Sequence, residues 1–484
     1  MNLQDANSES GSTRRRIAVI GGGFCGLAAA HRLLELGKDS GRGCDVTVFD
    51  AGESFGGLVR TKRIQDYLVE CGADSFITNK PAAIQLCRRL GLESELIATD
   101  ATYRRSLVLF RGKPHPVPDG FQLLAPASIA SIIKSPLFSW GGKLRMALEP
   151  FIPKRSSGED ESLASFVKRR LGNEALERLI QPMVGGIYTA DPERLSLRAT
   201  MPRFLEMEEK HGSLLRAMAV GSSNESQGGE ASGARYGLFA TLRGGLSDLT
   251  TALEKRVTEL GGKLRAGTRV TKLTRVEAIE GKYRIELVNR NPEDFEGVVM
   301  ALPTRAAAEL AEPLRKDLAN ELRKIEYASS AIVVSGHRLS EIRDPMEAFG
   351  LVVPAVESRE ILAVSFSSRK FPGRAPEGKI LLRTFIGGAM QPDQFQRGDS
   401  EMKGLVRNEL REIFGVTGEP DFMEVCRYPH SMPQYHVGHV GLVGRIRAEA
   451  SKLPGFALAG NAYDGVGIPD TIASGEQAAV QVWG

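Results

Sequence analysis

The sequence predicts an α/β fold in which one domain is assembled from segments far apart in the chain and a second domain is built on a sheet. Three observations lead to this prediction. A strand, turn, helix and strand pattern fills the first 50 residues. Strand-like segments return in the second half of the chain and are interrupted by helical stretches near 304–324 and 399–414. The last segment, residues 455–484, has the pattern of a strand, a glycine loop and a helix.

The first 50 residues have the pattern of a βαβ unit. Residues 15–20 (RRIAVI) end in an apolar run typical of a buried strand, and a glycine turn follows. Apolar residues at helical spacing come next, and we expect Gly37 to end that helix. Residues 45–50 (DVTVFD) then supply the second strand.

A glycine motif lies between the first strand and its helix. Gly21, Gly23 and Gly26 have the spacing G-x-G-x-x-G. The first glycine permits a tight turn, the second a close approach to a pyrophosphate, and the third close packing of helix on strand. Asp50 ends the second strand, where a carboxylate accepts hydrogen bonds from ribose hydroxyls. Together these features predict dinucleotide binding, and the alternative is a tight turn without a ligand.

A second glycine pair follows in residues 56–61 (GGLVRT). Gly57 offers a further backbone N–H, and Arg60 a cation beside a phosphate. The alternative for Arg60 is a solvated surface arginine. This extension resembles the FAD-dependent amine oxidase and desaturase superfamily.

The C-terminal loop contains Gly465, Val466, Gly467 and Ile468, and it leads into a helix with Pro and Asp in its first turn. The N–H groups of such a helix can face the pyrimidine edge of a flavin and stabilise negative charge there. The alternative is a plain glycine cap.

Longer stretches resemble the oxygen-dependent porphyrinogen oxidases, which act on protoporphyrinogen IX or coproporphyrinogen III. The most specific stretches are GGIYTADPERLSL at 185–197 and GVGIPDTIASG at 465–475. Others include ECGADSF at 70–76, KLRMALEPFIP at 143–153, LRGGLSDL at 242–249 and PQYHVGH at 433–439.

The resemblance implies a flavoenzyme of haem biosynthesis that oxidises a porphyrinogen to a porphyrin, with O2 as acceptor and H2O2 as product. Of the two substrates we favour protoporphyrinogen IX, with coproporphyrinogen III as the alternative. FAD is expected to be non-covalent, because the last cysteine, Cys426, lies well before the C-terminal loop. Rival interpretations are another flavin amine oxidase, a carotenoid desaturase, or a flavin-binding protein without catalysis.

The resemblance also implies roles for individual residues. The diphosphate and ribose region matches Gly21, Gly23, Gly26, Asp50, Gly57 and Arg60, and the flavin loop matches residues 465–468. The backbone of Val270 matches the adenine contact. Arg105, with Arg104 as second choice, is expected to bind a substrate propionate, and the alternative is an exposed loop arginine. Many family members carry Glu at the position of Asp50. No catalytic residue and no metal ligand is assigned.

The fold implied by the resemblance is a Rossmann-like FAD domain of the amine-oxidase type, a mixed-sheet substrate domain and a helical, membrane-facing region. We expect the FAD domain in residues 14–80, 241–303 and 440–484, and the substrate domain in 81–99 and 304–439. The helical region is expected in 100–210, a disordered tail in 1–13 and a mobile loop in 221–235.

Residues 119–142 are apolar around a single lysine. The resemblance implies membrane contact there, and the alternative is a helix pair packed in the core. A net charge of +4 gives no indication of nucleic acid binding. The five scattered cysteines form no C-x-x-C pair, which argues against a disulfide framework or a zinc site. We therefore expect a cytoplasmic protein, at most peripheral at the inner face of the cell membrane. The sequence leaves the oligomeric state open, a homodimer included.

Overall fold

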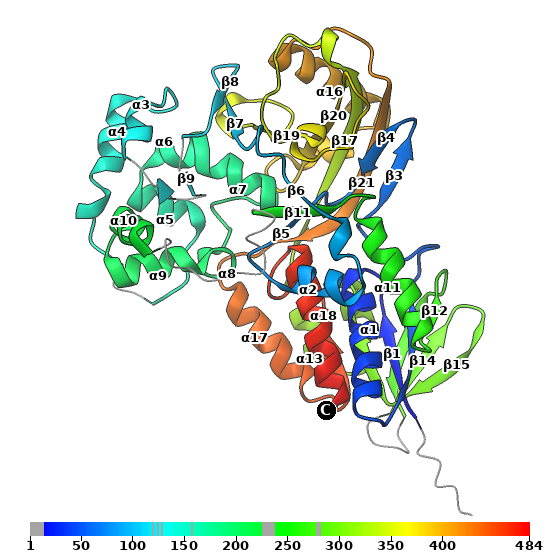
Figure 1. The fold of residues 1–484 in the computed structure, drawn as a ribbon. Helices are drawn as coiled ribbons and strands as arrows, with labels where there is room; N and C mark the ends of the chain where they lie inside the picture. The colour runs from blue at the N-terminus through cyan, green and yellow to red at the C-terminus, as the bar shows by residue number, and fades with distance from the viewer. Residues whose placement is uncertain are drawn as a thin grey trace, which may run out of the picture.

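The computed structural model describes residues 14–118, 121–122, 125–126, 129–155, 158–224, 238–276 and 282–484. The expected tail at 1–13 and residues 225–235 of the expected loop lie outside these residues. Residues 221–224 end helix α10 (Leu214–Asn224). Figure 1 shows the α/β architecture that the sequence predicts, with a lower sheet domain, an upper sheet domain and a helical region beside the upper one.

The lower domain is built on a five-stranded sheet in the order β12-β2-β1-β16-β22. All its pairs are parallel, and Ile17 of the central strand lies opposite Val46 and Gly297. Its strands come from separated parts of the chain, as predicted. They are β1 (Arg15–Ile20), β2 (Cys44–Phe49), β12 (Lys263–Arg265), β16 (Gly297–Met300) and β22 (Phe456–Leu458).

Both faces of this sheet are covered, so its strands are nearly continuous apolar runs. One face packs on α1 (Phe24–Asp39), α11 (Ser247–Glu259) and α18 (Ile468–Trp483). The other face packs on the small sheet of β13 (Val270–Arg275), β14 (Tyr283–Leu287) and β15 (Arg290–Phe295) and on three helices. These helices are α12 (Thr304–Ala311), α13 (Lys316–Leu322) and α17 (His439–Ala450).

The expected end of the first helix at Gly37 is wrong, because α1 continues to Asp39. A Cβ at Gly37 would lie 2.9 Å from Sγ of Cys44, the first residue of β2. Gly37 therefore serves the close approach of helix and strand and does not terminate the helix.

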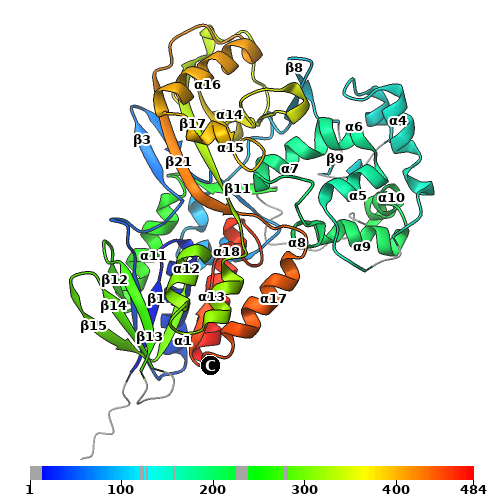
Figure 2. The ribbon, with the colours of Figure 1, turned by 180° about the vertical axis from the view of Figure 1, so that it is seen from behind.

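The upper domain contains a seven-stranded mixed sheet in the order β21-β17-β20-β19-β18-β7-β8. Its pairs are antiparallel except for β18 with β7. The strands are β7 (Ser106–Phe110), β8 (Lys113–Pro116), β17 (Tyr327–Arg338), β18 (Gly350–Val352), β19 (Ala363–Phe366), β20 (Lys379–Gly387) and β21 (Phe422–Pro433). Figure 2 shows α14 (Ser367–Lys370), α15 (Pro392–Gln396) and α16 (Asp399–Phe414) beside this sheet.

Residues 106–116 were expected in the helical region, but they form β7 and β8 at one edge of this sheet. The apolar run of β7 pairs in parallel with β18, more than 200 residues later, and its Val108 and Leu109 are buried. The hairpin of β7 and β8 is local, but the pairing of β7 with β18 joins segments far apart in the chain, so no pattern within residues 106–116 assigns them to this sheet.

Short elements join the domains. β3 (Thr61–Ile64) and β4 (Tyr67–Glu70) form a hairpin, and β5 (Phe76–Ile77), β11 (Phe239–Leu242) and β6 (Leu96–Ala98) form a three-stranded sheet. The helix α2 (Ala82–Arg89) packs in the same apolar cluster as α18.

The helical region has its own apolar cluster. Its α-helices are α3 (Ile129–Lys134), α4 (Trp140–Ala147), α5 (Leu163–Arg170), α6 (Asn173–Ala175), α7 (Gln181–Tyr188), α8 (Leu197–Thr200), α9 (Pro202–His211) and α10. Between them lie the strand pair β9 (Phe121–Gln122) and β10 (Ala125–Pro126), the short 3-10 helix at Glu149–Phe151 and the π-helical turn at Leu176–Ile180.

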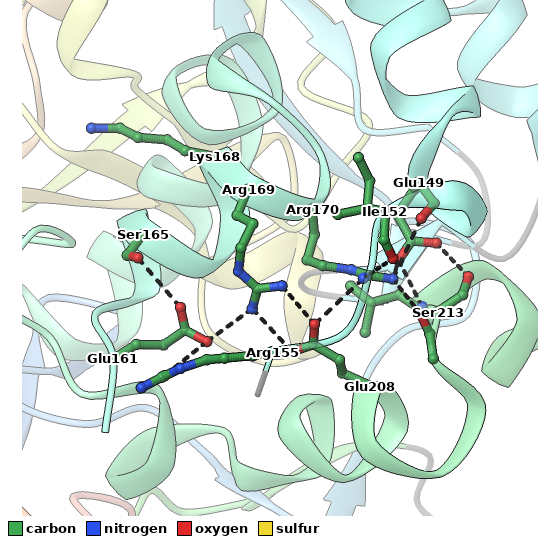
Figure 3. Close-up of polar contacts among 12 residues, drawn as sticks. Glu149, Ile152, Arg155, Glu161, Ser165, Lys168, Arg169, Arg170, Glu208 and Ser213 are labelled. Carbon is green, nitrogen blue, oxygen red and sulfur yellow. Dashed lines mark hydrogen bonds and ion pairs between the residues drawn. The ribbon is translucent and has the colours of Figure 1, made fainter. Parts of the chain in front are cut away.

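A buried charge network holds this region together (Figure 3). The fully buried Arg170 of α5 forms ion pairs with Glu149 and Glu208. Arg170 also donates to the carbonyl oxygen of Gly212 at 2.8 Å. Glu149 accepts the backbone N–H of Leu214 at 2.9 Å and so neutralises the start of α10. A single arginine thus joins α5, α9 and the start of α10.

Candidate cofactor and substrate site

The predicted dinucleotide residues gather at one edge of the lower sheet. Because the five strands are parallel, the residues that follow them lie at the same edge, where ligands bind in open α/β sheets. Gly21 follows β1, Asp50 follows β2, Ala301 follows β16 and Gly460 lies close behind β22. In Figure 1 this edge faces the upper domain. These residues therefore mark the expected ligand-binding crevice of the sheet, on the side toward the upper domain.

At two positions of the motif, close contacts with the protein backbone allow only glycine. Gly21 has φ +107°, and a Cβ there would lie 2.2 Å from the carbonyl oxygen of Ala301. A Cβ at Gly26 would lie 1.8 Å from the carbonyl oxygen of Gly21. Neither position has room for a side chain, because turn, helix and strand touch there.

Gly23 differs from both, because its missing side chain leaves open space. The nearest atom to a Cβ at Gly23 is Cα of Gly57, at 3.9 Å. Gly23 directly precedes α1, which has no acidic residue in its first turn and no side-chain cap. The free N–H groups and the positive end of the helix thus face an open cradle that fits a pyrophosphate.

The second glycine pair closes this cradle. The N–H of Gly56 donates to the carbonyl oxygen of Gly22 at 2.9 Å, and Gly23 and Gly56 form a parallel bridge. Arg60 lies a few residues further on, and its side chain is exposed. Within the described part of the chain, no carboxylate pairs with its guanidinium, so this cation is available to a phosphate.

The carboxylate of Asp50 stabilises the glycine turn after β1, in addition to its expected contact with the ribose. It accepts the backbone N–H of Gly22 at 2.6 Å and that of Gly52 at 2.7 Å. Two hydrogen bonds leave acceptor capacity for a ribose hydroxyl. The carbonyl oxygen of Asp50 accepts the N–H of Thr268 at 2.7 Å, two residues before Val270. The structure therefore brings the predicted ribose and adenine residues into neighbouring segments.

The C-terminal loop ends at the same crevice. Gly465 has φ +155°, and Gly467 precedes the first turn of α18. Ile468 at the start of α18 and Phe24 at the start of α1 belong to one apolar cluster. Both helices thus begin side by side at the crevice, and Val466 packs against the apolar cluster of the helical region.

A buried tyrosine that the sequence did not single out supports this loop. The hydroxyl of Tyr435 donates to the carbonyl oxygen of Asn461 at 2.6 Å, and its ring stacks on His439 at 3.9 Å. Burial raises the pKa of Tyr435, while a hydrogen bond from the N–H of Gly465 opposes this rise. Burial lowers the pKa of His439 to about 4. The stretch PQYHVGH contributed to the family resemblance, but no local pattern gave its tyrosine a role.

The two candidate propionate ligands, Arg104 and Arg105, are exposed and precede β7. The carbonyl oxygen of Arg105 accepts the N–H of Phe349 at 2.9 Å, which fixes its backbone to the seven-stranded sheet. Among the described residues, neither guanidinium forms an ion pair. Both are therefore free to meet an anion, although no contact joins them to the glycine turn.

The most family-specific stretch, 185–197, links the helical region to the upper sheet. The carbonyl oxygen of Thr189 accepts the N–H of Ala389, just beyond β20, at 2.8 Å. Nearby, Ile187 is 44% exposed and Met390 is 39% exposed. Gln181 contacts Met390 through its side-chain amide at 3.5 Å. Exposed apolar side chains in this position suit the wall of a site for an apolar ring system.

Within the described ranges, neither a cluster of metal ligands nor a membrane-spanning helix is present. There, no three potential metal ligands of the His, Cys, Asp and Glu types come together. In the same ranges no helix is both long and apolar enough to cross a membrane.

Comparisons with known proteins agree with this geometry. Residues 24–483 match the family model for flavin-containing amine oxidoreductases. The chain is 34% identical to the coproporphyrinogen III oxidase of Bacillus subtilis, over 96% of this chain and 97% of the relative. It is 31% identical to the enzyme of the same name from Staphylococcus aureus, over 97% and 99%.

More distant relatives follow. The mitochondrial protoporphyrinogen oxidase of Nicotiana tabacum is 28% identical over 98% of this chain and 96% of the relative. A solved structure from Exiguobacterium sp. 255-15 superposes with a TM-score of 0.84 at 28% identity and covers 97% of this chain and 98% of that one. A putrescine oxidase structure at 14% identity, with a TM-score of 0.66, shares the fold.

Proposed function

Since the chain belongs to the family of flavin-containing amine oxidoreductases and is an FAD-dependent enzyme, we propose that it oxidises a porphyrinogen to the corresponding porphyrin. The observation that carries the cofactor part is the open cradle at Gly23, which lies between the start of α1 and Gly57. The substrate part is supported by relatives named for porphyrinogen oxidation that match nearly the whole chain.

Coproporphyrinogen III is the substrate that we propose first, and protoporphyrinogen IX is the second candidate. The sequence alone favoured protoporphyrinogen IX. The two most similar relatives reported above, from Bacillus and Staphylococcus, are named for coproporphyrinogen III. This substrate carries propionates where the other has vinyl groups, so it needs more cations. The two unpaired arginines Arg104 and Arg105 supply such cations.

When bound, FAD would supply a two-electron acceptor for hydrogen removed from the porphyrinogen, with O2 as the final acceptor of two electrons and two protons and H2O2 as the product. The residues of the chain bind the cofactor and orient it. Gly23, Gly57 and Arg60 hold the non-covalent diphosphate, and Asp50 with Val270 holds the adenosine end. The N–H groups at the start of α18, at Gly467 and Ile468, stabilise negative charge at the flavin end. We assign no general base.

The first experiment measures O2 uptake and porphyrin fluorescence with FAD-loaded protein and each porphyrinogen in parallel. Porphyrin formation from either substrate supports the proposal, and the ratio of kcat/KM values identifies the preferred one. Bound FAD without porphyrin from either substrate would point to another amine oxidase or to a non-catalytic flavin protein. Bleaching of the flavin spectrum by anaerobic porphyrinogen separates these two, because only an enzyme is reduced.

A second experiment tests the propionate contact. Arg105→Ala should raise KM for coproporphyrinogen III roughly ten- to hundredfold with little change in kcat, since a lost charge-assisted hydrogen bond costs roughly 1.5–3 kcal/mol. Arg42→Ala is the matched control, because Arg42 is exposed in the loop between α1 and β2, at the opposite end of the sheet. An unchanged KM in Arg105→Ala would disprove its role.

We also propose that the helical region touches the inner face of the cell membrane. Of the expected contact segment, Leu137 and Phe138 are buried in the core, whereas Trp140 is 77% exposed. Trp140 and Leu144 line an apolar groove of about 220 Å³ beside Lys143. Flotation with anionic liposomes should recover the protein, and Trp140→Ser with Leu144→Ser should abolish recovery. No flotation with any lipid composition would discard this proposal.

A further inference from the structure

Two of the five cysteines face each other beside the cofactor crevice. Cys71 directly follows β4, and Cys426 lies in β21. Cys71 is 2% exposed, Cys426 is partly exposed, and both thiols are free. Both side chains belong to one apolar cluster, and each thiol lies close enough to the other to shift its pKa. The other three cysteines, Cys25, Cys44 and Cys87, are buried in different clusters.

The contacts on both sides show that this pairing is built into the fold. The rings of Tyr67 and Phe422 pack edge to face, with centroids 5.1 Å apart. Four residues later on both strands come Cys71 and Cys426. A Cβ at the next residue of the first strand, Gly72, would lie 3.4 Å from the hydroxyl oxygen of Tyr428. These two contacts place the β3–β4 hairpin and the residues that follow it against β21 on both sides of the two cysteines.

A cation stands next to the pair. Lys62, which lies opposite Val69 in the β3–β4 hairpin, forms an ion pair with Glu424 of β21. The neighbouring Cys426 thiol lowers the pKa of Cys71 against the effect of burial. The charges of Lys62 and Arg60 add to the lowering, and the carboxylate of Glu424 opposes it. A thiolate is the nucleophilic form of cysteine. By contrast, burial raises the pKa of Cys25 and of Cys87 to about 12.

We propose that Cys71 and Cys426 form a peroxide-oxidisable dithiol that closes to a disulfide. The Cys71 thiolate attacks one oxygen of H2O2, and the O–O bond breaks to give a Cys71 sulfenic acid and hydroxide. The Cys426 thiol then attacks the Cys71 sulfur, forms the S–S bond and releases water. Two thiols are oxidised, one H2O2 is reduced to two waters in total, and an external thiol reductant restores the pair.

The proposed source of the peroxide is the enzyme's own reaction, and this part of the inference rests on the proposed function. Porphyrinogen oxidation with O2 produces H2O2 inside the same molecule. The N–H of Cys71 donates to the carbonyl oxygen of Arg60 at 2.8 Å, so the dithiol adjoins the loop that is proposed to hold the diphosphate. In a reducing compartment, disulfides are typically transient and serve redox functions. The two thiols are therefore placed to reduce H2O2 close to where it is produced.

The test treats the FAD-loaded enzyme with stoichiometric H2O2, blocks free thiols with an alkylating agent and maps disulfides by mass spectrometry without reduction. We expect a Cys71–Cys426 linked peptide, a fall from five free thiols to three, and full reversal by dithiothreitol. Cys71→Ser and Cys426→Ser should each prevent the link. Cys44→Ser, which removes another buried cysteine, should leave it intact. Oxidation at other cysteines while Cys71 and Cys426 stay reduced would overturn the proposal.

A second arm replaces added H2O2 by turnover with porphyrinogen and O2, with and without catalase. We expect the same disulfide during turnover and its suppression by catalase. If the disulfide forms with added H2O2 but not during turnover, then the H2O2 made by the enzyme is not the oxidant. Porphyrin fluorescence in the same samples reports the proposed function separately, so the two failures are distinguishable.

Discussion

The hydroxyl of Tyr435 donates a hydrogen bond to the carbonyl oxygen of Asn461 at 2.6 Å, while its backbone carbonyl accepts the N–H of Ser196 at 2.7 Å. Tyr435 is 1% exposed. One buried residue therefore connects the C-terminal glycine loop of the lower domain to the helical region. This connection explains how a loop after a short strand keeps its position at the crevice.

Tyr435→Phe should loosen the flavin loop. The variant keeps the ring and its stacking on His439 but leaves the carbonyl of Asn461 without its donor, which costs about 1–3 kcal/mol. We expect weaker FAD binding by several-fold and a lower unfolding temperature, measured by flavin fluorescence titration and calorimetry. Tyr463→Phe is the matched control, because the hydroxyl of Tyr463 is buried in the same loop and has no partner among the described residues. Equal losses in both variants would contradict the role of Tyr435.

Gly23→Ala and Gly26→Ala should separate binding from folding. A methyl group at position 23 meets no protein atom closer than 3.9 Å, whereas one at position 26 would lie 1.8 Å from a backbone oxygen. We expect Gly23→Ala to remain folded but to lose FAD, because the methyl group fills the pyrophosphate cradle. Gly26→Ala should lower the unfolding temperature as well. Circular dichroism and the flavin absorbance of purified protein give both readouts, and full FAD content in Gly23→Ala would argue against the cradle.

The sequence predicted the α/β fold and the cofactor because these depend on local patterns. A strand, a glycine turn and a helix are contiguous, so the spacing of Gly21, Gly23 and Gly26 together with Asp50 predicted a dinucleotide, and the resemblance to FAD-dependent enzymes specified FAD. Gly37 was misjudged because a glycine late in a helical pattern has two explanations, an end of the helix or a close approach. Only the proximity of Cys44 shows which explanation holds.

The remaining features depend on contacts between distant segments. β7 pairs with β18 across more than 200 residues, and Tyr435 reaches Asn461 only after the domains have assembled. The pairing of Cys71 with Cys426 likewise requires the hairpin β3–β4 to lie against β21. No spacing rule within one segment reports such contacts, so composition and periodicity could not find them.

Arg170→Met should destabilise the helical region strongly. Removal of the cation leaves the buried Glu149 without a charged partner, while Glu208 keeps its ion pair with Arg169, and breaking a buried pair costs about 3–5 kcal/mol. Lys210→Met is the control, because the Lys210–Glu206 pair is largely exposed and should contribute less than about 1 kcal/mol. Urea unfolding followed by tryptophan fluorescence measures both. Similar unfolding midpoints for the two variants would show that the network contributes little to stability.

The stability of the enzyme should fall as the pH drops from 6.5 to 4, in part because of His439. Burial lowers the pKa of His439 to about 4 from 6.5, its value in the unfolded chain. Between these values the unfolded chain binds a proton that the folded protein excludes, so acid favours unfolding. The shift corresponds to a loss on the order of 3 kcal/mol. His439→Phe keeps an aromatic ring against Tyr435 but cannot titrate, so its unfolding free energy should depend less on pH. Urea midpoints of both proteins at pH 7.5, 6 and 5 measure this difference, and parallel pH profiles would exclude His439 as a source of the acid sensitivity.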